Sequence, residues 1–250
     1  MKRRGFLLAA AGIAYAISAL SMPGVTAAQE PDFAAARQEM VLQIEFTTAI
    51  FGQVTGFPGI DRRVLDAFEK VPRHRFVPPP LVPYAYMNMP LPLGYEQNLT
   101  QPFLLALMTQ ALQLKPGERV FETGTDTGYQ AAILAELGAQ VFSMEIVEPL
   151  FDIAKQLLPA LGYGNVALQL GDGYHGWAEN GPYDAMFIKE SVDEIPGALW
   201  RQLKSGGRMV IPLGTQFMTQ YLMLVEKKMD GSVTSRQILP VRFVPLTGGH

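Results

Sequence analysis

The feature that most constrains the fold is a regular alternation of short apolar strand patterns with apolar helical patterns between residues 101 and 202. The strand pattern RVFETG at 119–124, for example, is followed by the helical pattern YQAAILAELG at 129–138. Strands that alternate with helices favour a parallel sheet, because each helix returns the chain to the same end of the sheet. The last strand patterns follow one another without helices, which predicts an antiparallel edge. We therefore expect an α/β fold, a mostly parallel sheet with helices on both faces.

Two helical patterns precede this alternating region. Residues 32–50 place apolar side chains at helical spacing, and the glycines and proline of 52–60 are expected to end that helix. Residues 61–71 form the second pattern, with Asp61 in a position that suits an N-cap. These patterns predict an N-terminal helical extension to the α/β fold.

A proline-rich segment at 72–102 links the extension to the sheet. It is too apolar and aromatic for a flexible linker, so we predict a mostly extended loop that packs over a site. We place the N-terminal helices and this loop at 29–90 and the α/β domain at 91–250.

Composition excludes several classes of function. Hydrophobic residues make up 48% and charged residues 17% of the 250 positions, which is enough apolar content for a core. The net charge of −3 does not indicate a nucleic-acid partner. The chain has no cysteine, and its three histidines are far apart in sequence (His74, His175 and His250). We therefore predict no metal site.

Residues 1–28 have the pattern of a signal peptide. Positive charges at Lys2, Arg3 and Arg4 precede an apolar run over 6–20, which is short for a membrane span. RRGFLL resembles the twin-arginine export pattern, and small residues near Ala28 suit cleavage. We expect a protein of the periplasm or cell envelope with no stable membrane span after cleavage. The alternatives are an uncleaved anchor or a cytoplasmic protein.

Acidic residues and glycines stand at the ends of three successive strand patterns, where α/β sheets bind ligands. They are Glu122, Gly124, Asp126 and Gly128 at the end of the first, Glu145 at the end of the second, and Asp172 with Gly173 at the end of the third. An acid at the end of the second strand suits the hydroxyls of a ribose, which indicates an adenosine-type cofactor. The alternative is that these are turn glycines and solvent-facing acids. The loop lacks the GxGxxG fingerprint expected for a nicotinamide-dependent dehydrogenase.

The order of several segments resembles the protein-L-isoaspartate O-methyltransferase family, from about Ile60 to Leu246. The segments are VPRHRFVPP, PLPLGYEQNLTQPFLLALMT, LKPGERVFETGTDTGYQAAILAELGAQVFSMEIV, GDGYHGW, GGRMVIPLG and LPVRFVPL. The resemblance implies a Rossmann-like class I S-adenosylmethionine-dependent methyltransferase fold. It also implies methylation of the free carboxylate of L-isoaspartyl (and D-aspartyl) residues in damaged proteins, as protein repair.

The resemblance implies roles for particular residues. The loop Gly124–Gly128, which follows Glu122, would face the methionine part of S-adenosylmethionine, and Glu145 would bind the ribose. Asp172 and Gly173 would lie beside the adenine. Thr100, in EQNLTQP, takes the hydroxyl position of the family's catalytic segment.

This set of residues suits methyl transfer to a carboxylate. An α-carboxyl has a reference pKa of about 3.5, so the acceptor is ionised at neutral pH and needs no general base. Alignment and exclusion of water supply the rate. We expect Thr100 to orient the acceptor through its hydroxyl group.

Asp126 departs from the family loop, which usually reads GTGSGYQ where this chain reads GTDTGYQ. Near the methionine carboxylate, at about 4 Å, it would be repelled by about 4 kcal/mol at an effective dielectric of 20. Three interpretations remain open: Asp126 caps the next helix or is tolerated, alters the choice of ligand, or binds the methionine ammonium.

Lys189 and Glu190 stand where the family has small apolar residues. They are either an exposed salt-bridging pair or part of a changed pocket. With Asp126 they motivate an alternative function, an exported, catalytically lapsed relative that binds a small molecule or partner protein. The expected partner of the active form is an isoaspartyl-containing protein or peptide, and we expect a monomer.

Overall fold

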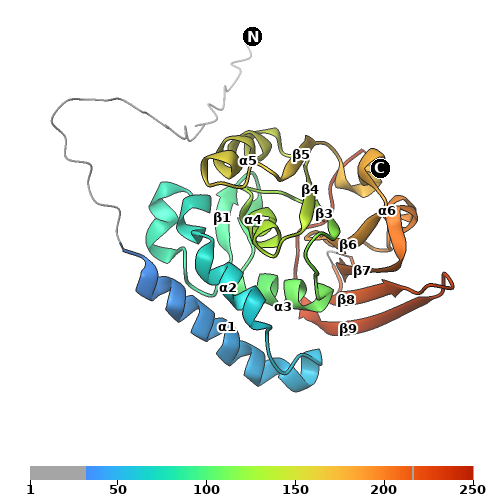
Figure 1. Cartoon of the computed structure of the whole chain (residues 1–250), viewed down its shortest axis with the longest axis horizontal. Helices are drawn as coiled ribbons and strands as arrows, with labels where there is room; N and C mark the ends of the chain where they lie inside the picture. The colour runs from blue at the N-terminus through green and yellow to red at the C-terminus, as the bar shows by residue number, and fades with distance from the viewer. Residues whose placement is uncertain (1–31, 216, 250) are drawn as a thin grey trace, which may run out of the picture. The chain divides into compact units, whose positions relative to one another are not determined.

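The computed structural model describes residues 32–215 and 217–249 (Figure 1). The predicted signal peptide at 1–28 lies outside the described residues. Phe33–His250 forms one compact unit, which includes both the N-terminal helices and the sheet. Within the described ranges, no helix is both long enough and apolar enough to cross a membrane.

A seven-stranded sheet is the centre of the described fold, with the strand order β5-β4-β3-β6-β7-β8-β9. Its strands are β3 (Arg119–Thr123), β4 (Gln140–Glu145), β5 (Ala167–Leu170), β6 (Tyr183–Phe187), β7 (Leu203–Leu213), β8 (Gln220–Lys227) and β9 (Val233–Val241). Neighbours from β5 to β7 are parallel, whereas β8 pairs antiparallel with both β7 and β9. The predicted parallel sheet with an antiparallel edge is confirmed.

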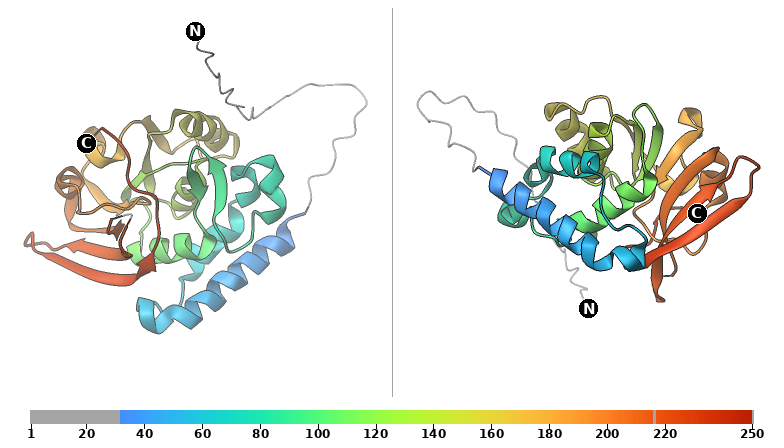
Figure 2. Two further views of the ribbon diagram at one scale, coloured as in Figure 1. Left: turned by 180° about the vertical axis from the view of Figure 1, so that it is seen from behind. Right: turned by 60° about the horizontal axis from the view of Figure 1, so that its bottom comes forward.

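Helices cover both faces of this sheet (Figures 1 and 2). They are α3 (Pro102–Leu112), α4 (Tyr129–Glu136), α5 (Glu148–Ala160) and α6 (Gly197–Gln202). Alternate side chains of β3 point to opposite faces: Val120 joins the apolar cluster formed with α3, α4 and α5, while Phe121 joins the cluster that contains Leu199 of α6. The sheet is therefore buried on both faces, which explains its nearly continuous apolar strand patterns.

The N-terminal extension consists of α1 (Ala34–Thr55) and α2 (Arg62–Lys70). Asp61 caps α2 as predicted, since its side chain accepts a hydrogen bond from the Arg63 backbone N–H at 2.9 Å. The prediction that α1 ends before Gly52 is wrong. Gly52 lies inside α1, where an added Cβ would come within 3.1 Å of the Pro58 Cα, so it serves close packing of the returning chain. The helix ends instead at Gly56, which has a φ of +71°.

The proline-rich segment is less extended than predicted. It contains two 3₁₀ helices, η1 (Arg73–Phe76) and η2 (Pro79–Tyr84), and a hairpin of β1 (Leu91–Gly94) and β2 (Gln97–Leu99). Proline fixes φ near −65°, a value that a 3₁₀ helix shares with extended polyproline, so the sequence did not distinguish the two. The prediction that the segment packs is confirmed, because it contributes buried side chains such as Phe76 and Leu91.

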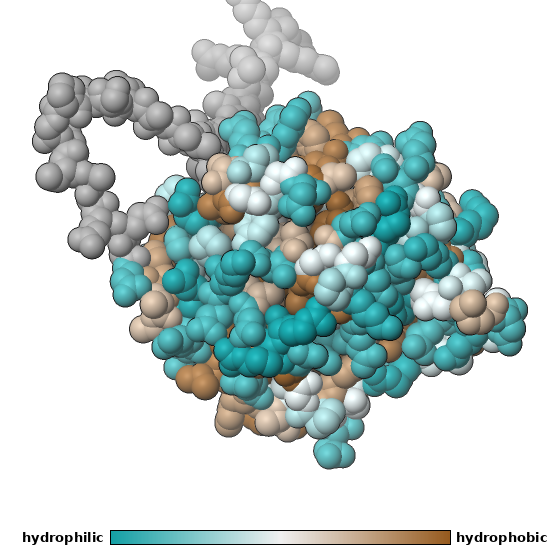
Figure 3. Space-filling view, viewed as in Figure 1, coloured by the Kyte–Doolittle hydropathy of each residue, from teal (hydrophilic) through white to brown (hydrophobic). Residues whose placement is uncertain are grey.

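The outward face of α1 carries a row of apolar side chains at intervals of four residues. Leu42, Phe46, Ile50 and Val54 are 58%, 69%, 58% and 66% exposed. Their opposite face is buried against the core through Met40 and Ile44 among others, so α1 presents apolar side chains on both faces. On the face of the molecule shown in Figure 3, hydrophilic residues surround scattered apolar areas.

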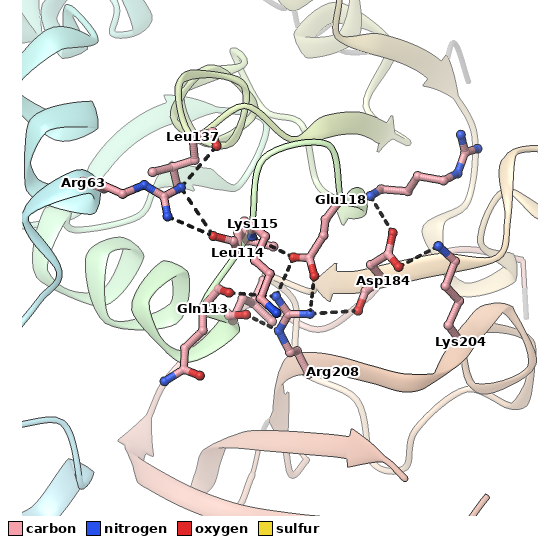
Figure 4. A network of polar contacts seen from close by, with 11 residues as sticks. Arg63, Gln113, Leu114, Lys115, Glu118, Leu137, Asp184, Lys204 and Arg208 are labelled. Carbon is pink, nitrogen blue, oxygen red and sulfur yellow. Dashed lines mark hydrogen bonds and ion pairs between the residues drawn. The ribbon is translucent and has the colours of Figure 1, made fainter. Parts of the chain in front are cut away.

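An ionic network holds the amino-terminal ends of the central strands (Figure 4). Arg208 of β7 contacts Glu118 at 2.6 Å and donates to the Gln113 carbonyl at 3.0 Å. Asp184 of β6 accepts a hydrogen bond from Lys204 at 2.6 Å. The network lies at the edge of the sheet opposite the carboxyl ends of the strands, so it stabilises the scaffold without occupying the ligand-binding edge.

Candidate active site

Two adjoining clefts open at the carboxyl ends of the parallel strands. The first, here called the cofactor cleft, is lined by Thr123, Gly124, Met144, Glu145, Ile146, Val147, Gly173, Pro245, Leu246 and Thr247. The second, here called the acceptor cleft, is lined by Pro90, Asn98, Thr100, Gln101, Leu104, Lys189, Arg242, Phe243 and Val244. Gln97, Asp126 and Glu190 line both, so the clefts meet at these three side chains.

The loop between β3 and α4 needs its two flanking glycines. Gly124 and Gly128 have φ values of +61° and +99°. An added Cβ at Gly124 would collide with the Glu190 carboxylate, and one at Gly128 would lie 2.9 Å from the Leu158 Cγ. Asp126, between them, also adopts a positive φ of +53°, a conformation that aspartate tolerates better than most residues. The carboxylate at 126 is therefore compatible with the shape of the loop.

Asp126 does not cap the following helix. The N-cap of α4 is Gly128, and no side chain caps this helix end. The Asp126 Oδ2 instead lies 3.0 Å from the Lys189 Nζ, and its backbone N–H donates to Glu145 Oε2 at 2.7 Å. The capping interpretation is wrong because the side chain turns towards β6 rather than back along α4.

Lys189 and Glu190 are not an exposed pair. Lys189 is only 6% exposed, and its Nζ lies between Asp126 and Glu122, with the Glu122 Oε1 at 3.3 Å. Glu190 is partly buried and accepts a hydrogen bond from the Thr123 hydroxyl group. The interpretation of an exposed salt bridge is wrong, and both side chains belong to the wall between the two clefts.

Glu122 and Glu145 are buried carboxylates with different partners. Glu122 accepts a hydrogen bond from the Ser143 hydroxyl at 2.7 Å, and burial raises its pKa to about 7 although Lys189 opposes the shift. Glu145 accepts from the backbone N–H groups of Val147 and Asp126, at 2.8 and 2.7 Å. Burial, followed by the Asp126 charge, raises the Glu145 pKa to about 7.

The pKa of Lys189 is also raised, but by the neighbouring carboxylates rather than by burial. Burial lowers the pKa of Lys189, but the charges of Asp126 and Glu122 outweigh this effect and raise the pKa above its usual range. Lys189 is therefore a fixed cation at neutral pH.

Asp172 and Gly173 follow β5 at the far end of the cofactor cleft. Gly173 lines the cleft, and an added Cβ there would lie 2.8 Å from the Thr123 Cγ2. Asp172 accepts hydrogen bonds from the backbone N–H groups of Tyr174, at 2.9 Å, and of Gly249, at 3.1 Å. Gly173 therefore contributes to the cleft surface, while the Asp172 carboxylate holds its own turn and the C-terminal segment.

Thr100 lines the acceptor cleft, and its position depends on a residue that sequence reasoning missed. Arg73 is fully buried and donates to the Thr100 carbonyl at 2.8 Å and to the Ala85 carbonyl at 2.9 Å. Its guanidinium also lies 4.8 Å from the centre of the Tyr129 ring. The available signal was an arginine inside the apolar segment VPRHRFVPP, because a buried arginine requires several acceptors.

Sequence reasoning also missed the course of the C-terminal segment. β9 ends at Val241. Backbone hydrogen bonds then join Ser191 to Val244 at 2.8 Å and to Leu246 at 2.9 Å. Residues 242–247 thereby form one wall of both clefts.

The residues of the cofactor cleft suit an adenosyl ligand. Gly124 and Gly173 provide close approach to the backbone, and the fixed carboxylate of Glu145 can accept hydrogen bonds from ribose hydroxyl groups. No group of three or more metal-ligating side chains occurs in residues 32–215 and 217–249. With the parallel sheet, these features define the class: a Rossmann-like class I methyltransferase that uses S-adenosylmethionine.

Comparison with known proteins identifies the family. The pattern described as "Protein-L-isoaspartate(D-aspartate) O-methyltransferase (PCMT)" matches residues 56–250. Protein-L-isoaspartate O-methyltransferase 2 of Polaromonas sp. is 56% identical over 194 residues, covering 78% of this chain and 92% of the relative. Protein-L-isoaspartate O-methyltransferase 1 of Cupriavidus necator is 49% identical over 238 residues, covering 95% and 92%. The chain belongs to the protein-L-isoaspartate O-methyltransferase family.

Solved structures agree with the fold. A protein-L-isoaspartate O-methyltransferase, 31% identical, superimposes with a TM-score of 0.74 over 85% of this chain and 66% of that one. A Plasmodium falciparum protein titled as a member of this family in complex with S-adenosyl-L-homocysteine gives a TM-score of 0.70 over 84% of this chain and 98% of that one. The second protein is 21% identical, so it supports the fold alone.

Proposed function

We propose that this chain transfers the methyl group of S-adenosylmethionine to the free carboxylate of L-isoaspartyl and D-aspartyl residues in damaged proteins. The observation that carries the proposal is the pair of adjoining clefts. One has the glycines and the carboxylate of Glu145 that suit the donor, and the other contains Thr100. Family membership supports the same reaction.

The geometry assigns each part of the chain a separate task. Glu145, fixed by two backbone N–H groups, would bind the ribose. Thr100, held through its carbonyl by the buried Arg73, would orient the acceptor carboxylate through its hydroxyl group. S-adenosylmethionine supplies an electrophilic methyl group when it is bound. The C-terminal segment and the β1–β2 hairpin line the junction of the clefts. With both ligands bound they would exclude water, which favours transfer to the acceptor over hydrolysis.

No residue needs to remove a proton, because the acceptor carboxylate is already ionised at neutral pH. Methyl transfer leaves the carboxylate as a methyl ester and the donor as S-adenosylhomocysteine. The chain's contribution is therefore alignment of the two ligands at the junction, and this accounts for a site without a catalytic histidine.

The test is methyl transfer from S-adenosylmethionine to an isoaspartyl peptide, with the same peptide containing ordinary aspartate as the control. Thr100→Val removes the hydroxyl while keeping the shape, and we expect kcat to fall at least tenfold with little change in the KM for the donor. Thr100→Ser should restore most of the rate. Absence of transfer to the isoaspartyl peptide by the unsubstituted chain would overturn the proposal.

The alternative of a catalytically lapsed relative rested on Asp126, Lys189 and Glu190. Asp126 is not a lone carboxylate, because it forms a buried contact with Lys189, which also pairs with Glu122. This contact reduces the repulsion of about 4 kcal/mol expected for a lone carboxylate near the carboxylate of the donor. The geometry favours the active enzyme.

We also propose that residues 1–28 direct the protein out of the cytoplasm through the twin-arginine route. The support is the Arg3–Arg4 pair followed by an apolar run. The match to the Cupriavidus necator protein covers 95% of the chain, so it reaches into this segment. Replacing Arg3 and Arg4 by lysine, which keeps the charge, should retain the protein in the cytoplasm on cell fractionation. Unchanged release of the variant to the periplasm would exclude this route.

A further inference from the structure

The three positions that depart most from the family pattern around the cleft form one cluster in space. Asp126 and Lys189 are in contact at 3.0 Å although 63 residues separate them. Glu190 adjoins Lys189 in the chain and lies against Gly124, the first residue of the loop that carries Asp126. The three residues that differ from the family pattern, which are separate in the sequence, thus lie together in the wall between the two clefts.

This wall leaves the cofactor cleft with more negative than positive groups. Asp126, Glu145 and Glu190 line the cofactor cleft, and Glu122 lies behind Lys189. Among the described residues, Lys189 is the one cation that forms an ion pair with any of these four carboxylates, and it contacts Glu122 and Asp126. Asp172 lies beyond Gly173 at the adenine end, beside His175 at 4.0 Å, and Arg242 lies across the acceptor cleft. The cluster is short of positive charge before any ligand binds.

The electrostatics of the four carboxylates agree with this imbalance. Burial raises the pKa of Glu122 and of Glu145 to about 7, and it raises the pKa of Asp126 and of Glu190 as well. Carboxylates that resist ionisation are stabilised when a cation enters their surroundings.

The two forms of the cofactor differ in the charge that they bring. S-adenosylmethionine carries a sulfonium, an ammonium and a carboxylate group, and has a net charge of +1. S-adenosylhomocysteine has an uncharged thioether sulfur and a net charge of zero. We propose that Asp126, Lys189 and Glu190 set the selectivity of the cofactor cleft, so that it binds the cationic donor in preference to the uncharged-sulfur product. The inference rests on the proposed function and adds to it a means of limiting product inhibition.

Glu190 is the informative position because it lines both clefts and, unlike Asp126, does not contact the buried lysine in a close ion pair. Glu190→Gln removes one negative charge and keeps the shape and the acceptor for the Thr123 hydroxyl. Glu45→Gln, on the exposed face of α1, makes the same change in net charge away from the clefts and serves as the matched control.

The experiment is calorimetry of the purified chain with S-adenosylmethionine and S-adenosylhomocysteine, expressed as the ratio of the two Kd values. We expect Glu190→Gln to lower the preference for the donor about tenfold, while Glu45→Gln leaves it unchanged. In the unsubstituted chain, the preference should grow between pH 6 and pH 8, as Glu122 and Glu145 ionise. Sinefungin, which has a protonated amine in place of the sulfonium methyl, should follow the donor.

Three results distinguish the inference from the proposed function. If neither ligand binds the unsubstituted chain, the proposed function fails and the inference with it. If both ligands bind but the ratio is the same in Glu190→Gln and Glu45→Gln and at both pH values, the selectivity inference alone fails. Sinefungin that binds like the product would attribute the preference to the methyl group rather than to charge, and would also overturn the inference.

Discussion

The contact between Asp126 and Lys189 predicts a strong energetic coupling between two residues that are distant in sequence. Lys189 Nζ lies 3.0 Å from Asp126 and 3.3 Å from Glu122, and all three side chains are buried. At an effective dielectric of 20, each attraction at this distance is about 5 kcal/mol. Desolvation offsets most of that gain, but removing one partner leaves a buried charge unpaired, which costs about 3–5 kcal/mol.

The two single substitutions should lower the free energy of unfolding by different amounts. Lys189→Met leaves two neighbouring carboxylates without their cation, and we expect a loss of about 3 kcal/mol in the free energy of unfolding. Asp126→Asn keeps the shape and the tolerance of a positive φ, and Lys189 retains Glu122, so we expect a loss of about 1 kcal/mol. The double variant should be more stable than Lys189→Met alone, because it no longer buries the uncompensated charge of Asp126. The coupling energy is then about 2 kcal/mol.

The assay is urea denaturation at pH 7.5, with the free energies obtained by linear extrapolation. The surface pair of Lys70 and Glu136, at 2.7 Å with Lys70 69% and Glu136 15% exposed, is the control. The cycle of Lys70→Met and Glu136→Gln should give a coupling below about 1 kcal/mol. If the loss of unfolding free energy in the double variant equals the sum of the two single losses within about 0.5 kcal/mol, Asp126 and Lys189 are not coupled and the reasoning is refuted.

Two further predictions concern stability. Because the pKa values of Glu122 and Glu145 are raised from about 4.5 to about 7, the folded state binds more protons than the unfolded state between these values. Unfolding free energy should therefore fall by about 2 kcal/mol for each of the two carboxyl groups as pH rises from about 5 to about 7.5; thermal melts without ligand that are flat across this range would contradict it. Gly128→Ala should destabilise the chain by about 2 kcal/mol more than Gly162→Ala in urea denaturation. Both glycines have φ above +90°, but an added Cβ meets Leu158 only at Gly128; equal losses would exclude the packing contribution.

Local patterns were sufficient for the layout of the fold. The alternation of strand and helix patterns predicted the parallel sheet, and Asp61 predicted the start of α2, because period and capping depend on neighbours a few residues apart. The placement of Glu122, Gly124, Glu145 and Gly173 at one edge also followed from the sequence, since parallel strands end together. Prolines were less informative, because the φ that they impose suits several conformations.

The chemistry at the junction of the clefts was decided by tertiary structure. The sequence presented Asp126 as an isolated charge and left Lys189 with Glu190 as either a surface pair or part of a changed pocket. The sheet brings the ends of β3 and β6 side by side and joins these residues in one cluster. The support of Thr100 by Arg73 and the passage of the C-terminal segment across both clefts have the same origin. Periodicity determines which face a residue occupies, but its partner depends on where the chain packs, and that is a property of the whole fold.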